Sequence, residues 1–81
     1  MVITVKFYSF YQNLAGKESI QVQMPDHSTL GDLLDTLKEL FPQLFPEAEK
    51  ALFIINQKAA VRESVLNDGD QVLMLAILSG G

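Results

Sequence analysis

The stretch TLGDLLDTLKELFP, residues 29–42, predicts the one long helix of the chain and thereby decides the fold. Its apolar residues recur at the three- and four-residue spacing of one helical face, opposite charged side chains. Thr29 followed by Asp32 resembles a capping box, with Asp in place of the usual Glu or Gln. Pro42 lacks an amide donor, so we expect the helix to end there. The apolar face consists of Leu30, Leu33, Leu34, Leu37, Leu40 and Phe41.

The residues before this helix have the two-residue period of strands. Val2–Phe10 alternates in part between apolar and polar side chains, and in Ile20–Met24 the apolar residues alternate with Gln21 and Gln23. Asn13–Lys17, with Gly16, is typical of a turn. We therefore expect the two strands to form a hairpin.

The residues after the helix predict further strands and two turns. Gln43–Lys50 indicates an irregular connection with a helical turn in it, and Ala51–Ile55 predicts a strand. Asn56 is a candidate left-handed turn residue before a shorter strand, Lys58–Val61. Asn67-Asp68-Gly69-Asp70 is the strongest turn signal of the chain.

The last predicted strand, Val72–Leu78, is a run of seven apolar residues. Such a run favours burial on both faces, one against the helix and the other against something else. The element order is strand, strand, helix, strand, short strand, strand. This order predicts an α+β fold of the ubiquitin-like β-grasp type, a mixed sheet with one main helix packed across it and its last strand beside its first.

Composition limits the classes of function. The 81 residues, 48% of them hydrophobic, suffice for one domain, which we expect at residues 1–78. The net charge of -4, with six basic residues scattered along the chain, disfavours nucleic acid as a partner. No apolar run is long enough to span a membrane, so we expect neither membrane association nor export, and a cytoplasmic location. The lack of cysteine fits a reducing compartment.

The side chains offer little for an ordinary enzyme site. His27, the one histidine, lies in a polar stretch and is interpreted as a surface or capping residue. Asp68 and Asp70 lack the further ligands of a calcium loop, so we interpret them as turn residues and expect no metal site. The glycines form no phosphate-binding motif, and we expect no cofactor on this chain.

The C-terminal end, Ser79-Gly80-Gly81, remains as the candidate reactive group. We expect residues 79–81 to form a flexible tail, because two glycines let a backbone enter a narrow tunnel of a partner enzyme. Adenylation by ATP would activate the terminal carboxylate, and attack by a sulfur species would then yield a thiocarboxylate. No side chain of this chain need act as acid, base or nucleophile.

Over its whole length the chain resembles the MoaD/ThiS sulfur carriers, and its length is closer to MoaD, the small subunit of molybdopterin synthase, than to ThiS. The resemblance rests on Phe7-Tyr8, Leu14-Ala15-Gly16, Ile55-Asn56-Gln57, Asp68-Gly69-Asp70-Gln71-Val72 and Ser79-Gly80-Gly81. The chain departs from MoaD in having Ala76-Ile77 where a proline pair is usual, and Gln12-Asn13 where an Arg is frequent.

The resemblance implies a cycle with two protein partners. A MoeB-like adenylating enzyme would use ATP to activate Gly81, next to Gly80, and a MoaE-like large synthase subunit would accept the tail and pass sulfur to a pterin precursor. Tyr8, Ala59 and Leu75 match a hydrophobic partner-binding surface, and Ile77, Leu78 and Ser79 match the start of the inserted tail. The residues alone equally allow Tyr8 and Leu75 to be core residues. On this interpretation the chain is the sulfur-donating subunit of a synthase, without an independent catalytic site.

Three alternatives stay open at this stage. Related carriers serve thiamin synthesis, tRNA thiolation or tungsten cofactor assembly, and they share this tail. A ubiquitin-like modifier would be joined through Gly81 to lysines of target proteins. A plain interaction module of the same fold would tolerate loss of Gly81.

Overall fold

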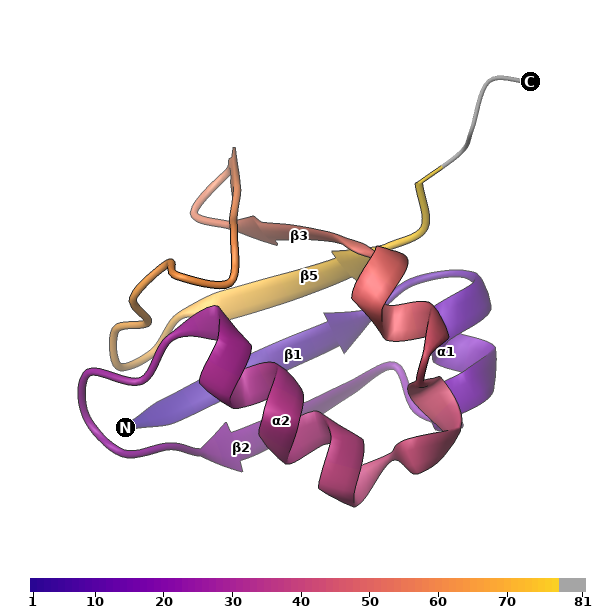
Figure 1. Ribbon diagram of the computed structural model, residues 1–81, viewed down its shortest axis with the longest axis horizontal. Helices are drawn as coiled ribbons and strands as arrows, with labels where there is room; N and C mark the ends of the chain where they lie inside the picture. Colours follow the sequence, from indigo (N-terminus) through magenta and orange to yellow (C-terminus); the bar gives the residue numbers. More distant parts are fainter. Residues whose placement is uncertain (78–81) are drawn as a thin grey trace.

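A five-stranded mixed sheet with one long helix across it forms the computed structural model, which describes residues 1–77 (Figure 1). The strands are β1 (Val2–Phe7), β2 (Ser19–Gln23), β3 (Leu52–Ile55), β4 (Lys58–Ala59) and β5 (Gln71–Leu75), in the order β2-β1-β5-β3-β4. β1 is antiparallel to β2 and parallel to β5, while β3 is antiparallel to both β5 and β4. The predicted β-grasp arrangement, with the last strand beside the first, is confirmed.

The long helix, α2 (Leu30–Leu40), begins and ends where the sequence predicts. The Asp32 amide donates to Thr29 Oγ1 at 3.2 Å, and Asp32 Oδ2 accepts from the Thr29 amide at 2.9 Å, so the capping box is complete. Leu30, Leu33, Leu34 and Leu37 are buried as expected. Leu40 was assigned wrongly, because it is 56% exposed. Each step of three residues falls short of a full helical turn, and two such steps from Leu34 carry Leu40 off the buried face.

The segment after β1 differs from the prediction. The strand ends at Phe7 instead of Phe10, and a short helix, α1 (Phe10–Ala15), replaces most of the expected turn. Ser9, with a φ of 50°, reverses the chain direction between the two elements. Gly16 ends α1 with a φ of 73°, and its amide donates to the Gln12 carbonyl at 2.9 Å. The antiparallel pairing of β1 with β2 is confirmed, but a helix connects them.

The connection after α2 contains two 3₁₀ turns, η1 (Pro42–Leu44) and η2 (Glu47–Lys50), where one helical turn was expected. Leu44 and Ala48 point into the core and are fully buried. The Tyr11 hydroxyl donates to the carbonyl oxygen of Glu47 at 2.9 Å. This hydrogen bond joins α1 to η2 and closes that end of the core.

The two predicted turns are present, although β4 is shorter than the predicted Lys58–Val61. Asn56 and Gln57 both have positive φ, 53° and 68°, which matches the twist of a tight hairpin. In the turn before β5, Asp68 Oδ1 accepts from the Val2 amide at 2.7 Å and Asp70 Oδ2 accepts from the Asn67 amide at 2.9 Å. Both carboxylates therefore serve the turn, as interpreted from the sequence.

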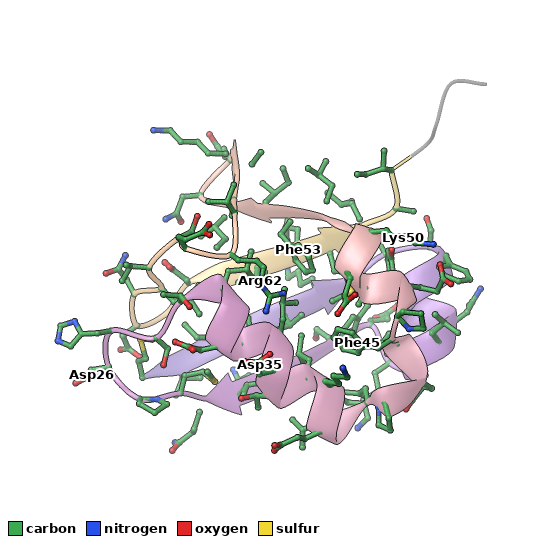
Figure 2. All side chains as sticks on the ribbon, in the orientation of Figure 1. Asp26, Asp35, Phe45, Lys50, Phe53 and Arg62 are labelled. Carbon is green, nitrogen blue, oxygen red and sulfur yellow. The ribbon has the colours of Figure 1, made fainter. Side chains whose placement is uncertain are left out.

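The core lies between α2 and one face of the sheet. Ile3, Val5, Phe7, Val72 and Met74 contribute the sheet side, and each is at most 2% exposed. On the surface above, Arg62 from the segment after β4 lies 3.7 Å from the carboxylate of Asp35 on α2 (Figure 2). In the part of the chain that the structure describes, no helix has the length and apolar character needed to cross a membrane.

Candidate partner-binding face

The face of the sheet turned away from α2 carries no helix among residues 1–77, and in Figure 1 it is the side behind the strands. Strand side chains alternate between the two faces, so the residues next to the buried ones form this open face. The strand register aligns one residue from each strand in a row across it: Ser19, Lys6, Leu73, Ile54 and Ala59.

The open face has an apolar half and a polar half. The apolar half lies over β5, β3 and β4, with Tyr8 at the end of β1, and we call it the apolar patch: Tyr8, Leu52, Ile54, Ala59, Leu73 and Leu75. The polar half lies over β2 and the starts of β1 and β5, with Thr4, Ser19, Gln21, Gln23 and Gln71. Tyr8 is 38% and Leu52 36% exposed, so the patch presents large apolar side chains to solvent.

Three residues predicted to contact partners lie in this patch. Tyr8 lies at the end of β1 and is exposed, Leu75 is the last residue of β5 and is half-buried, and Ala59 is exposed on β4. Neither Tyr8 nor Leu75 is a core residue. The structure therefore brings the three together on one face, and three strands lie between β4, which carries Ala59, and β2 at the far edge of the sheet.

Sequence reasoning missed Leu52, Ile54 and Leu73 as members of the patch. Their signal was the same alternation that defines the strands: Phe53 and Ile55 are buried, so Leu52 and Ile54 point the other way. Only the pairing of β3 with β5 shows that Leu52 lies opposite Leu75 and Ile54 opposite Leu73.

The last strand is shorter than predicted. β5 ends at Leu75, Ala76 and Ile77 follow outside it, and Ile77 is 62% exposed. Val72 and Met74 face the core, whereas Leu73 and Leu75 are only half-buried, so the outward side of this apolar strand is not covered within the described chain. The predicted tail residues Leu78, Ser79, Gly80 and Gly81 lie outside the described residues.

A shallow pocket of about 370 Å³ marks the end of the open face where β5 begins. The hairpin and the turn before β5 form it, and it is lined by Ile54, Asn56, Gln57, Gly69, Gln71 and Leu73. His27 lies elsewhere, exposed in the loop before α2, as its interpretation as a surface residue requires. Within residues 1–77 no three His, Cys, Asp or Glu side chains gather as metal ligands do.

Comparisons with solved structures agree with this fold. SAMP1 of Haloferax volcanii superposes over 100% of both chains with a TM-score of 0.89 at 22% sequence identity. A chain from the complex of subunits 1 and 2 of molybdopterin-converting factor from Helicobacter pylori matches over 100% of both chains, with a TM-score of 0.74 at 21% identity. At these identities the likeness concerns the fold.

Sequence relatives give a closer relationship. The molybdopterin synthase sulfur carrier subunit of Mycobacterium tuberculosis is 31% identical over 65 residues, which are 80% of this chain and 76% of that protein. The protein of the same name from Dictyostelium discoideum is 29% identical over 80 residues, 95% of this chain and 93% of that protein. The ThiS family model matches residues 5–81. The chain therefore belongs to the ThiS family.

Proposed function

We propose that this chain is a sulfur carrier, the small subunit of a molybdopterin synthase, and that it acts through the terminal carboxylate of Gly81. The two sequence relatives are named molybdopterin synthase sulfur carrier subunits, and the alignment with one of them covers 95% of this chain and 93% of that protein. The proposed division of labour is a β-grasp domain, residues 1–78, that docks on partners, and a tail, residues 79–81, that carries the sulfur.

The observation that carries the proposal is the position of the apolar patch relative to the end of β5. Leu75 belongs to the patch and is also the last strand residue before the C-terminal sequence Ala76–Gly81. Those six residues can reach at most about 20 Å from Leu75, even when fully extended. A partner that covers the patch is therefore close enough to receive the terminal carboxylate in its own active site.

The proposed chemistry needs no catalytic side chain on this protein. A carboxylate oxygen of Gly81 attacks the α-phosphorus of ATP and displaces pyrophosphate, which gives an acyl-adenylate. Hydrosulfide, or a persulfide that is afterwards reduced by a thiol, attacks the acyl carbon and expels AMP. The product is the Gly81 thiocarboxylate, which donates its sulfur to a pterin precursor.

Two proteins supply what this chain lacks. A MoeB-like adenylating enzyme binds ATP and catalyses the first step, and a MoaE-like large subunit holds the pterin and accepts the tail. The Helicobacter pylori structure is a complex of subunits 1 and 2 of molybdopterin-converting factor, which supports a large-subunit partner for this chain. The proposed location is the cytoplasm, where ATP and reducing thiols are both abundant.

Reconstitution of the synthase tests the proposal. The chain, the adenylating enzyme and the large subunit from the same organism are combined with ATP, a sulfide source and the pterin precursor, and dithiolene formation is measured. Wild type is expected to support it, whereas deletion of Gly81 or addition of one residue after Gly81 abolishes it. Because β5 ends before the tail, both variants should unfold in urea at the wild-type midpoint. Full activity of the Gly81 deletion would refute the carrier function.

A further inference from the structure

We infer that Lys6 selects partners by pairing with a carboxylate at the border of the surface that covers the apolar patch. The inference rests on the proposed function, because it concerns the partner that receives the tail. It assigns a specificity role to a residue outside the patch and gives the chemistry of the matching group.

Lys6 occupies the boundary between the two halves of the open face. In the row across the sheet it lies between Ser19 of β2 and Leu73 of β5. Tyr8 of the apolar patch follows it by two residues on the same strand. The residue is half-buried, the degree of burial of a lysine whose stem packs on apolar surface while its ammonium stays in water.

Lys6 is the one charged side chain that the strands place on this face. The other outward strand residues are apolar, hydroxyl or amide side chains, as the register of β1 with β2 and β5 shows. The whole chain has a net charge of -4, so a cation at this position differs from the general character of the protein. A partner that reads charge here meets a single positive group.

No ion pair occupies this ammonium within residues 1–77. The ion pairs of that part of the chain join the N-terminus to Asp26, Lys50 to Glu47, and Arg62 to Asp35. Glu18 lines a shallow pocket of about 330 Å³ together with Lys6, Tyr8 and Gln12, yet it forms no ion pair with Lys6. The ammonium is thus available to a group from outside.

Docking on the patch changes the surroundings of Lys6. A protein that covers Leu73 and Tyr8 also removes water from the ammonium between them, and a desolvated charge without a partner opposes binding. A carboxylate on the partner, opposite β1, offsets this loss and attracts the acidic chain in the correct orientation. An apolar surface without that carboxylate is rejected for the same reason.

This requirement also argues against a second copy of the chain as the occupant. The strands of the open face supply no carboxylate, so the strands of two such faces would bring lysines together with apolar, hydroxyl and amide side chains. The structure therefore favours a different protein, with an apolar docking surface and one acidic residue on its border.

The test measures the dissociation constant of the complex with the purified large synthase subunit from the same organism. Lys6→Glu should weaken binding by about 100-fold or more, and Lys6→Met by about tenfold, since each leaves the partner's carboxylate unpaired. Lys6→Arg keeps the charge and should bind as wild type does. Lys58→Glu is the matched control, because Lys58 is exposed on β4, pairs with the core-facing Ile55, and should change binding less than about twofold.

The outcomes separate this inference from the proposed function. Wild-type binding by Lys6→Glu and Lys6→Met, together with loss of binding by Leu73→Asp, would overturn the role of Lys6 and leave the docking face intact. Equal weakening by Lys6→Glu and Lys58→Glu would also overturn it, because general charge would then explain the effect. No binding by wild type would overturn the proposed function, and this inference with it.

Discussion

The amide of Tyr8 donates a hydrogen bond of 3.2 Å to the carbonyl oxygen of Met74. This bond extends the parallel pairing of β1 and β5 to their ends and places Tyr8 beside the last residues of β5. An exposed aromatic ring and the last residue of β5 thus lie at the same end of two central strands of the sheet. Under the proposed function, this relationship would let one partner hold the domain and accept the tail.

Leu73→Asp should remove partner binding while leaving the fold intact. Leu73 lies at the centre of the row across the open face and is half-buried, so a carboxylate there would be desolvated on docking. We expect the dissociation constant for the large subunit to rise about 30-fold or more. This is a loss of about 2 kcal/mol of binding free energy, as at other central interface residues. Calorimetric titration measures this change.

Gln21→Asp is the matched control for Leu73→Asp. Gln21 lies on the same face, on β2, at the far side of the polar half. Both substitutions place an Asp in a strand, which lowers the free energy of unfolding by up to about 1 kcal/mol. Equal losses of binding by the two variants would mean that the apolar half is not the contact surface.

Thr29→Ala should destabilise the protein by about 1 kcal/mol, because it removes the hydroxyl that accepts from the Asp32 amide at the start of α2. For a domain of this size the loss lowers the melting temperature by about 4–8 °C. Thr29→Ser keeps an oxygen at the same position and should recover most of that difference. Urea and thermal unfolding followed by circular dichroism give both values.

Tyr11→Phe should lower the free energy of unfolding by about 1 kcal/mol near neutral pH, because the carbonyl of Glu47 loses its donor. Burial, with a smaller contribution from the charge of Glu47, raises the pKa of Tyr11 above its ordinary value of about 10. The folded state therefore holds this proton more tightly than the unfolded state does.

The pH dependence follows from that difference in proton binding. The stabilising contribution of Tyr11 is fully present below pH 10 and is lost as the pH rises through the folded pKa. Wild type should thus lose stability more steeply than Tyr11→Phe as the pH rises above about 10. Parallel curves of unfolding free energy against pH for the two proteins would contradict the assignment.

The fold was predictable where local signals and tertiary packing agree. The capping box at Thr29 and the stop at Pro42 define α2 in the sequence, and the structure has the same boundaries within two residues. The short helix α1 was missed because the strand was extended to Phe10, although Phe10 departs from the two-residue alternation of Ile3, Val5 and Phe7. The chain changes direction between β1 and α1 at Ser9, which has a positive φ. Because Ser9 is not a glycine, the sequence gives no sign of this conformation. The spacing of Tyr11, Leu14 and Ala15 before Gly16 was the available signal for this helix.

The candidate site was predictable only in part. Alternation assigns each strand residue to one of two faces, but the composition of the open face depends on which strands are neighbours. The parallel pairing of β1 with β5 and the antiparallel pairing of β3 with β5 place Lys6, Leu73 and Ile54 in one row. These pairings join Lys6 to Leu73, 67 positions apart, and Ile54 to Leu73, 19 positions apart, and no local pattern specifies them.

The most direct test of the carrier chemistry is the intact mass of the chain after incubation with ATP, a MoeB-like adenylating enzyme and a sulfide source. We predict a mass gain equal to one exchange of oxygen for sulfur, located at Gly81 by fragmentation and absent without ATP. An unchanged mass, while the same enzyme modifies its own established carrier protein, would contradict the carrier chemistry. If Leu73→Asp still failed to bind the large subunit, the chain would remain a docking domain without that chemistry.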